Sequence, residues 1–336
     1  MFFPLTIEMR KATRLKPLIL RNLQLISPVA VAPMVDYSHS ALRTLVQECG
    51  GAGLLYTEML SIRRLPSETV QHCPLLVSTP AENPLFYQVV GSEPERLPAA
   101  VAKVHSLGAA GIDLNLGCPA PRIRKMGAGA ALIANRQRLT AMLRALRKET
   151  TLPISVKIRL AAPQGHTFSS FCKMLEDEGV DCITVHARKP GEKFCRKPDW
   201  SAVAKGKRAV SIPLFVNGGI FSVDDAREAL KQSAADGVMV GRGAIMRPWL
   251  CREITDALQG RETVAEYTEQ TVYFRFLSLL NERFTGRQCL DRLKYFTKYY
   301  SKLFPFGHGF YSKIINSSTM EEAEEHARVF FASQQS

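Results

Sequence analysis

Short apolar runs alternate with amphipathic stretches along most of the chain. Eight of these runs are aliphatic and bounded by glycine, proline or polar residues; they lie at 29–33, 53–57, 85–90, 111–116, 153–158, 182–186, 213–217 and 236–240. Runs of this kind predict buried parallel strands. Helical patterns separate several of them, at 93–107, 136–150, 167–178 and 222–232. Ser222, with Asp225 three residues later, indicates the start of the last of these helices.

Strand–helix alternation repeated eight times is typical of a TIM (β/α)8 barrel, an α/β fold. A doubly wound open sheet is the alternative, but the count of eight and the lack of an early Gly-x-Gly-x-x-Gly motif favour the barrel. The alternation stops near residue 250, and the rest of the sequence reads as helical. We therefore predict a flexible basic extension at 1–17, a barrel at 18–255 and a small all-α helical domain at 256–336.

The net charge points to a polyanionic partner. Lys and Arg number 44 against 31 Asp and Glu, which gives +13 over 336 residues. Such an excess favours nucleic acid, although an enzyme that is merely basic is the alternative. The eight cysteines include no Cys-x-x-Cys pair, so we expect neither a metal site nor a disulfide framework. No apolar run is long enough to span a membrane, and we expect a cytoplasmic protein.

Polar residues and glycines gather where the predicted strands end, and in a TIM barrel these ends form the catalytic rim. Gly218 and Gly219 follow the seventh strand, and Gly241 and Arg242 follow the eighth. At these two positions backbone N–H groups can approach a phosphate, and Arg242 can pair with its charge. The alternative is that these glycines only make tight turns.

Three further side chains on this rim are candidates for chemistry. Lys157 lies in a strand pattern, where a lysine is costly unless it meets an anion or an electron-rich group; an outward-facing register is the alternative. His186 ends a strand, as either a core residue or a site residue. Cys118 stands in a Gly-Cys-Pro turn just after a strand. A thiol there can act as a nucleophile or a general acid, although most free cysteines only pack.

Nine short motifs follow one another over about residues 18–255. They are APMVD at 32–36, YTEM at 56–59, Gln-x-x-Gly at 88–91, NLGCP at 115–119, a glycine- and alanine-rich stretch at 127–133, VKIR at 156–159, HAR at 186–188, NGGI at 217–220 and GRGA at 241–244. Together they resemble the tRNA-dihydrouridine synthases, and NLGCP is the most specific of them. The stretch Arg247-Pro248-Trp249 resembles the bacterial B-type branch of that family.

The resemblance implies an FMN enzyme that uses NADPH to reduce the C5=C6 bond of specific uridines in tRNA. Hydride goes from reduced flavin to C6, and Cys118, the implied general acid, protonates C5. Asn115 is implied to hold the uracil ring, and Arg188 on the same rim is assigned to the substrate. The residues implied to contact FMN are Pro33, Met34, Val35, Gln88, Lys157, His186, Asn217, Gly218, Gly219, Gly241 and Arg242.

The helical domain has the composition expected of an RNA-binding surface. Basic residues share one predicted helical face, at Arg287, Lys294, Lys298 and Lys302. We expect Lys294 and Lys298 to contact tRNA, and the interleaved aromatic residues to pack mainly in the core. Two other functions remain possible: a small-molecule FMN oxidoreductase of the dihydroorotate or dihydropyrimidine dehydrogenase type, and an RNA-binding protein without catalysis. We expect a monomer.

Overall fold

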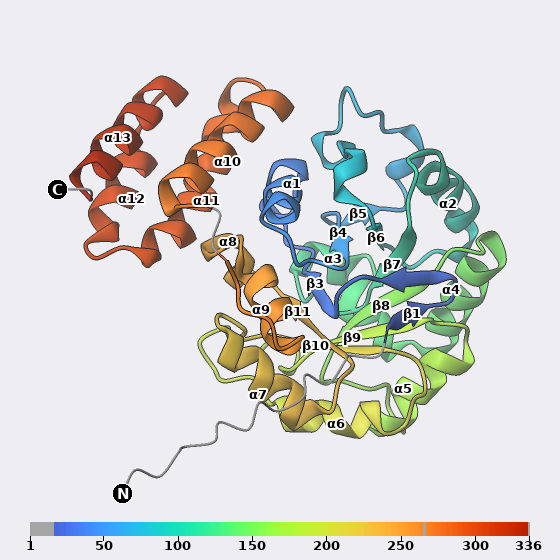
Figure 1. Ribbon diagram of the computed structural model, residues 1–336. Coiled ribbons are helices and arrows are strands. Elements are labelled where there is room, and N and C mark those ends of the chain that lie inside the picture. Colours follow the sequence, from blue (N-terminus) through green and yellow to red (C-terminus); the bar gives the residue numbers. More distant parts are fainter. Residues whose placement is uncertain (1–16, 265–266, 335–336) are drawn as a thin grey trace, which may run out of the picture.

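The computed structural model describes residues 17–264 and 267–334. Within the first segment, eight parallel strands form a ring in the order β3, β11, β10, β9, β8, β7, β6 and β4. Their bounds are β3 (Val29–Val31), β4 (Leu55–Tyr56), β6 (Leu85–Val90), β7 (Gly111–Asn115), β8 (Ile154–Arg159), β9 (Cys182–His186), β10 (Leu214–Asn217) and β11 (Gly237–Val240). The Val31 N–H donates to the Leu54 carbonyl at 2.9 Å and closes the ring beside β4. The predicted barrel is confirmed and the open sheet is excluded (Figure 1).

Side chains alternate between the inside and the outside of the barrel, as the two-residue period of a strand requires. Tyr56, Phe86, Phe215 and Met239 pack together inside, whereas outward-facing residues such as Val185 join the larger core beneath the helices. The inward positions are apolar near the strand starts and become polar toward the strand ends. The barrel interior is therefore a packed apolar core near the strand starts and a polar layer near the strand ends.

A short β-hairpin covers the N-terminal end of the barrel. The pattern of apolar residues did not predict this hairpin. It consists of β1 (Leu18–Leu20) and β2 (Leu23–Leu25), paired antiparallel. Leu20 and Leu25 are buried and pack with the inner cluster. Residues 1–16 of the predicted extension lie outside the described residues.

Helices surround the barrel, and their bounds are α1 (Ser40–Cys49), α2 (Leu97–Ser106), α3 (Pro121–Lys125), α4 (Arg136–Glu149), α5 (Phe168–Asp177), α6 (Trp200–Lys207), α7 (Val223–Ser233), α8 (Arg242–Met246) and α9 (Leu250–Leu258). The predicted cap is present, because the Ser222 side chain accepts from the Asp225 N–H at the start of α7. The expected alternation is wrong at one repeat. Between β4 and β6 the chain forms β5 (Leu60–Ser61) and short 3₁₀ turns instead of an α-helix.

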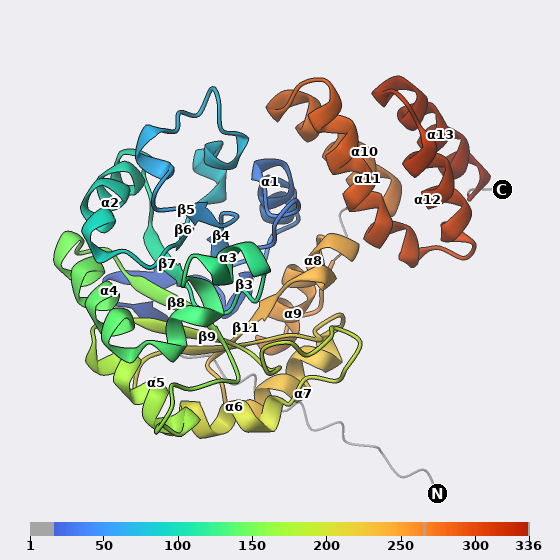
Figure 2. The same cartoon turned by 180° about the vertical axis from the view of Figure 1, so that it is seen from behind.

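The C-terminal helices form a separate bundle beside the barrel (Figures 1 and 2). In the described part they are α10 (Glu269–Arg283), α11 (Arg287–Tyr300), α12 (Gly307–Asn316) and α13 (Met320–Ser333). Their core is aromatic: Phe276 stacks on Phe296 with ring centroids 3.9 Å apart, and Phe310 is buried between helices. The helical domain is therefore confirmed as an all-α unit.

The bundle contacts the barrel mainly through α1 and α10. Arg275 forms an ion pair with Glu48 at 2.7 Å, and the Arg283 Nε donates to Ser40 Oγ at 3.1 Å. Helix α9 runs through the boundary expected at 255/256, and Thr255 on it bonds to Ser27 Oγ and to the Gly51 carbonyl. It thus packs as part of the barrel. None of the helices in 17–264 or 267–334 is long and apolar enough to cross a membrane.

Candidate functional site

A cavity of about 330 Å³ opens at the C-terminal ends of the barrel strands. Its size lies in the usual range for bound cofactors and ligands, roughly 300–1,000 Å³. Every residue assigned to FMN from the sequence lines it: Pro33, Met34, Val35, Gln88, Lys157, His186, Asn217, Gly218, Gly219, Gly241 and Arg242. Cys118, Asn115 and Arg188 line it as well. The parallel strands place these residues together because all of them end at the same edge.

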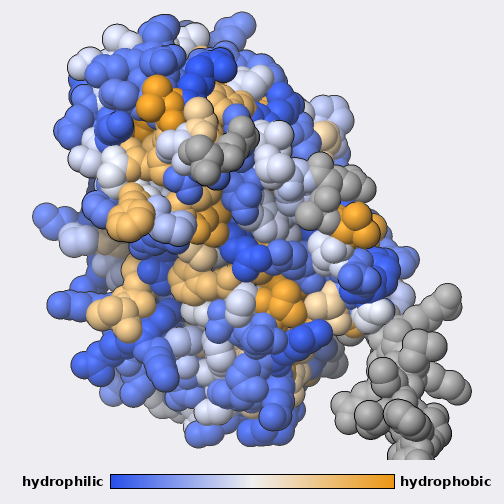
Figure 3. Space-filling view, turned by 60° about the vertical axis from the view of Figure 1, so that its left-hand side comes forward, coloured by the Kyte–Doolittle hydropathy of each residue, from blue (hydrophilic) through white to orange (hydrophobic). Residues whose placement is uncertain are grey.

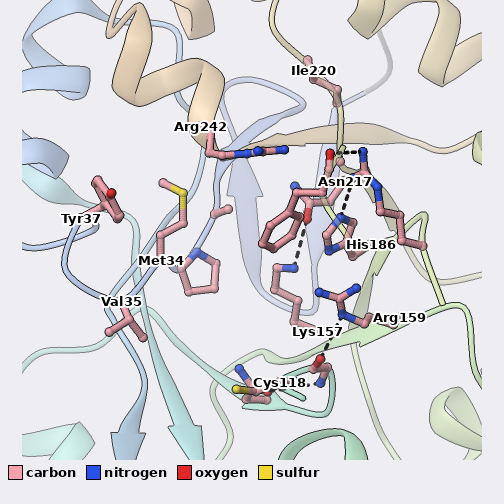
Figure 4. A pocket seen from close by; sticks show the side chains of 18 of the residues that line it. Met34, Val35, Tyr37, Cys118, Lys157, Arg159, His186, Asn217, Ile220 and Arg242 are labelled. Atoms are coloured by element: carbon pink, nitrogen blue, oxygen red, sulfur yellow. Dashed lines mark hydrogen bonds between the residues drawn. The ribbon is translucent and has the colours of Figure 1, made fainter. Parts of the chain in front are cut away.

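The floor of the cavity is polar and cationic. The Lys157 ammonium donates to Asn217 Oδ1 at 3.1 Å, and the Asn217 amide donates to the Met239 carbonyl at 2.7 Å. Figure 4 shows Lys157 and Asn217 pointing toward one another at the centre of the cavity. Burial lowers the pKa of Lys157 to about 8, and Asp113 only partly opposes this effect. Lys157 therefore faces inward, and its outward-facing alternative is excluded.

His186 is held in its neutral form by its surroundings. Burial, followed by the charges of Lys157 and nearby arginines, lowers its pKa to about 2. Arg188 Nη1 lies 3.0 Å from His186 Nε2. Because a guanidinium only donates hydrogen bonds, Nε2 must accept and the ring proton must sit on Nδ1. His186 thus offers a neutral Nδ1–H donor on the cavity wall.

The positive groups around the cavity are not paired in contact with carboxylates in the described part of the chain. In residues 17–264 and 267–334, no salt bridge links Lys157, Arg159, Arg188 or Arg242 to a carboxylate. Arg242 instead lies over the Phe194 ring, 4.8 Å from its centroid. Uncompensated cations in a concave site favour an anionic ligand.

The turn after β10 exposes its backbone to the same cavity. Gly218 has φ +108° and Gly219 has φ +76°, so both adopt the left-handed region that favours glycine. A Cβ on Gly218 would lie 2.6 Å from the His186 ring. Both glycines are therefore required by the local geometry, and they leave room for a phosphate close to the main chain.

Cys118 lies at the far side of the cavity from Arg242, half-buried in the turn between β7 and α3 (Figure 4). Its backbone N–H donates to Asn115 Oδ1 at 2.9 Å, and its carbonyl accepts from the Ala130 N–H at 3.0 Å. The thiol is thus held on a fixed turn and faces the cavity. The site has a cationic, glycine-lined end at Arg242 and, opposite it, an end that carries a thiol.

Several residues that line the cavity were not assigned from the sequence, among them Arg159, Phe194, Tyr37 and Tyr299. Arg159 lies two residues after Lys157 on β8, and that spacing alone predicts the same face. Phe194, in the loop after β9, stacks on His186 with centroids 5.8 Å apart. Tyr37 and Tyr299 reach the cavity from the barrel and the helical bundle, with centroids 5.6 Å apart. No local pattern signals the last three.

The two lysines assigned to tRNA lie outside the cavity. Lys294 donates to the Ser317 carbonyl at 2.6 Å and so ties α11 to the C-terminal end of α12. Lys298 is exposed on the bundle surface. Arg188 lines the cavity but is 3% exposed, and it donates to the carbonyls of Arg196 and Phe194. Its guanidinium therefore holds the loop that carries Phe194.

Solved structures with a similar fold are reductases. A 2-naphthoyl-CoA reductase matches with a TM-score of 0.57 at 15% identity over 74% of this chain and 52% of its own. A morphinone reductase mutant in complex with tetrahydroNAD matches with a TM-score of 0.53 at 12% identity, over 73% and 90%. At such identities the likeness defines the fold alone, a TIM barrel with a ligand cavity at its strand ends.

Sequence relatives identify the family. The profile of the dihydrouridine synthases matches residues 30–334, and the chain belongs to this family. It is 30% identical to a probable tRNA-dihydrouridine synthase 1 of Synechocystis over 92% of this chain and 88% of the relative. It is 34% identical to a probable tRNA-dihydrouridine synthase of Rickettsia prowazekii over 73% and 75%. A tRNA-dihydrouridine(16) synthase of Aquipseudomonas alcaligenes is 29% identical over 88% and 98%.

Proposed function

We propose that this chain is a flavin-dependent tRNA-dihydrouridine synthase, which adds hydrogen across the C5=C6 bond of specific uridines in tRNA. Membership of the dihydrouridine synthase family carries this conclusion. The cavity supports it, because an anion-binding end and a thiol-bearing end face each other across a space of cofactor size. The B-type branch stays a prediction, since the relatives' names carry no branch.

The residues of the cavity fit FMN. Backbone N–H groups at Gly218, Gly219 and Gly241, with Arg242, suit its phosphate. Lys157 offers a positive charge and Asn217 an amide beside the place of a ring system. When bound and reduced by NADPH, FMN supplies the hydride that C6 of the uridine gains. The buried polar floor excludes bulk water and keeps Lys157 and the neutral His186 in fixed positions.

Cys118 is proposed to hold the proton that C5 gains. Its half-buried turn lines the cavity, while Asn115 Oδ1 accepts from the main-chain N–H groups of Gly117 and Cys118. Asn115 also lines the cavity, where one amide proton remains for the uracil ring beyond its bond to Gln88. A thiol is suited to this step because it gives up a proton near neutral pH.

The helical bundle is proposed to hold the rest of the tRNA. A target base must leave its stack to reach a buried cavity, so the enzyme needs contacts to the surrounding RNA. Tyr299 brings the bundle to the edge of the cavity, and the surface is mostly hydrophilic around apolar patches (Figure 3). The net charge of +13 supports the same partner. We also propose NADPH as reductant, a cytoplasmic location and a monomer.

The decisive experiment measures dihydrouridine in tRNA. Nucleoside mass spectrometry of tRNA from cells with and without the gene should show loss of defined dihydrouridines, and adding the purified protein, FMN and NADPH should restore them. Yellow protein that reduces free pyrimidines but leaves tRNA unchanged would favour the small-molecule oxidoreductase. Protein that binds tRNA but neither flavin nor NADPH would favour the RNA-binding alternative.

A further inference from the structure

A line of hydrogen bonds runs through the barrel interior to the Cys118 turn. Ser155 Oγ donates to Asp113 Oδ1 at 2.5 Å, and Gln88 Nε2 donates to Asp113 Oδ2 at 2.7 Å. The Asn115 amide then donates to Gln88 Oε1 at 2.9 Å. Asn115 Oδ1 in turn accepts from the main-chain N–H of Cys118, at 2.9 Å. Strand register places the first three of these residues side by side on β6, β7 and β8.

The Asp113 carboxylate sets the donor-to-acceptor direction of this line of hydrogen bonds. An ionised carboxylate only accepts hydrogen bonds, so Gln88 must turn its NH2 group toward Asp113. The Gln88 oxygen then faces Asn115 and requires the Asn115 NH2 group there. As a result the Asn115 oxygen faces the turn, where main-chain N–H groups need an acceptor. Without Asp113, the Gln88 NH2 group has no acceptor, and only the N–H groups of the turn remain to orient the two amides.

Asp113 is an expensive residue at its position. Its side chain is 0% exposed in the barrel interior, and burial raises its pKa to about 6 against the opposing effect of its hydrogen bonds to Ser155 and Gln88. Its neighbours in register on the adjacent strands are Gln88 and Ser155, both held by its hydrogen bonds, whereas Tyr56, Phe86 and Phe215 fill other inward positions of the barrel. An apolar residue would satisfy packing at this depth without the cost of desolvation, so packing does not explain the carboxylate.

We propose that Asp113 is a positioning residue for the proton-donating turn: by fixing the orientation of the Gln88 and Asn115 amides, it holds Cys118 in place for protonation of the uridine. It acts through two other side chains and does not touch the substrate. The inference rests on the proposed function for its catalytic consequence, while the claim about the turn stands on the hydrogen bonds alone.

Two variants of Asp113 separate amide orientation from charge and from volume. Asp113→Asn keeps an acceptor for Gln88 through its Oδ1 and donates through its Nδ2 to Ser155, so the line survives although the charge is gone. Asp113→Ala removes the acceptor and leaves the Gln88 NH2 group unpaired at the buried end of the line. Thr184→Val is the matched control, because Thr184 is a fully buried barrel hydroxyl that lies outside the line.

Three measurements on the FMN-loaded full chain test the proposal. They are the rate of flavin reduction by NADPH, the rate of dihydrouridine formation in tRNA, and the rate of Cys118 alkylation by iodoacetamide, resolved by peptide mass spectrometry. Asp113→Ala should reduce flavin normally, form dihydrouridine up to about 100-fold more slowly, and alkylate faster at Cys118 because the turn is looser. Asp113→Asn and Thr184→Val should match the wild type in all three.

The outcomes distinguish the proposal from its rivals. If Asp113→Asn fails as badly as Asp113→Ala, the charge acts, through Lys157, and the orientation argument is wrong. Equal alkylation of Cys118 in folded Asp113→Ala and in wild type overturns it as well. Absence of dihydrouridine formation in the wild type would refute the proposed function instead, and the alkylation rates would still decide whether Asp113 orders the turn.

Discussion

Lys157 provides the sharpest test of the cationic cavity. Its ammonium lies 3.1 Å from Asn217 Oδ1, and burial lowers its pKa to about 8. A bound anion favours the charged form of the lysine and therefore raises that pKa. Binding then takes up a proton wherever the lysine starts neutral. FMN affinity should consequently fall as the pH rises through about 8.

The size of the effect follows from the fraction of lysine that is charged before binding. One pH unit above a pKa of about 8, about one tenth of the molecules carry the charge, so the dissociation constant should be about tenfold higher at pH 9 than at pH 6. Lys157→Met removes the titrating group and keeps an unbranched side chain. Because it also removes a buried cation, the free variant should unfold at a temperature equal to or above that of the wild type at pH 7.

Titration of apoprotein with FMN from pH 6 to pH 9, followed by quenching of flavin fluorescence, measures this directly. Ionisation of the flavin itself is common to both proteins, so the difference between their pH profiles isolates the lysine. Affinity should drop about tenfold more in the wild type than in Lys157→Met, and the variant should bind more weakly at pH 6. Parallel profiles would refute the assignment of Lys157 to the cofactor.

Three further outcomes are expected. Cys118→Ala should slow dihydrouridine formation by about 10²–10⁴-fold in single-turnover assays while flavin reduction by NADPH is unchanged; slowing of both steps would contradict a role limited to proton transfer. Glu82→Gln leaves the fully buried Arg43 without its countercharge, 2.6 Å away, and should cost about 3–5 kcal/mol in urea unfolding; a loss below 1 kcal/mol would contradict it. Lys298→Ala should weaken tRNA binding and lower its salt dependence by about one charge, whereas an unchanged slope would remove Lys298 from the RNA surface.

The strands could be predicted from the sequence because each is a compact apolar run that must be buried. The eight predicted runs at 29–33 through 236–240 all contain barrel strands. The hairpin at 18–25 could not be predicted, because its strands are only three residues long and the polar residues Arg21 and Asn22 separate them. The absence of an α-helix between β4 and β6 could not be predicted, because counting the repeats assumes that every strand is followed by a helix. Residues 65–82 instead contain three short 3₁₀ helices.

The residues of the site also fall into those that the sequence predicts and those that it does not. Residues at strand ends could be predicted because the barrel brings every strand end to one rim. Phe194 could not, because its place over His186 depends on the path of a loop that Arg188 holds through carbonyl contacts. Tyr299 could not, because it reaches the cavity and Tyr37 only when the helical bundle docks against the barrel. Contacts that form only when the bundle docks against the barrel leave no hydrophobic periodicity in the sequence of either part.

The polar side chains inside the barrel link the stability of the fold to the binding of an anionic ligand in the cavity. Lys157 and Asp113 are both held where burial disfavours their charged forms, and their pKa values move toward each other, to about 8 and about 6. Burying either charge lowers the stability of the ligand-free chain. An anion bound in the cavity offsets the part of this cost that is due to the cations. The same carboxylate directs the amides that hold the Cys118 turn. In the proposed function, the residues expected to bind the cofactor and the turn expected to donate the proton therefore share one buried polar layer.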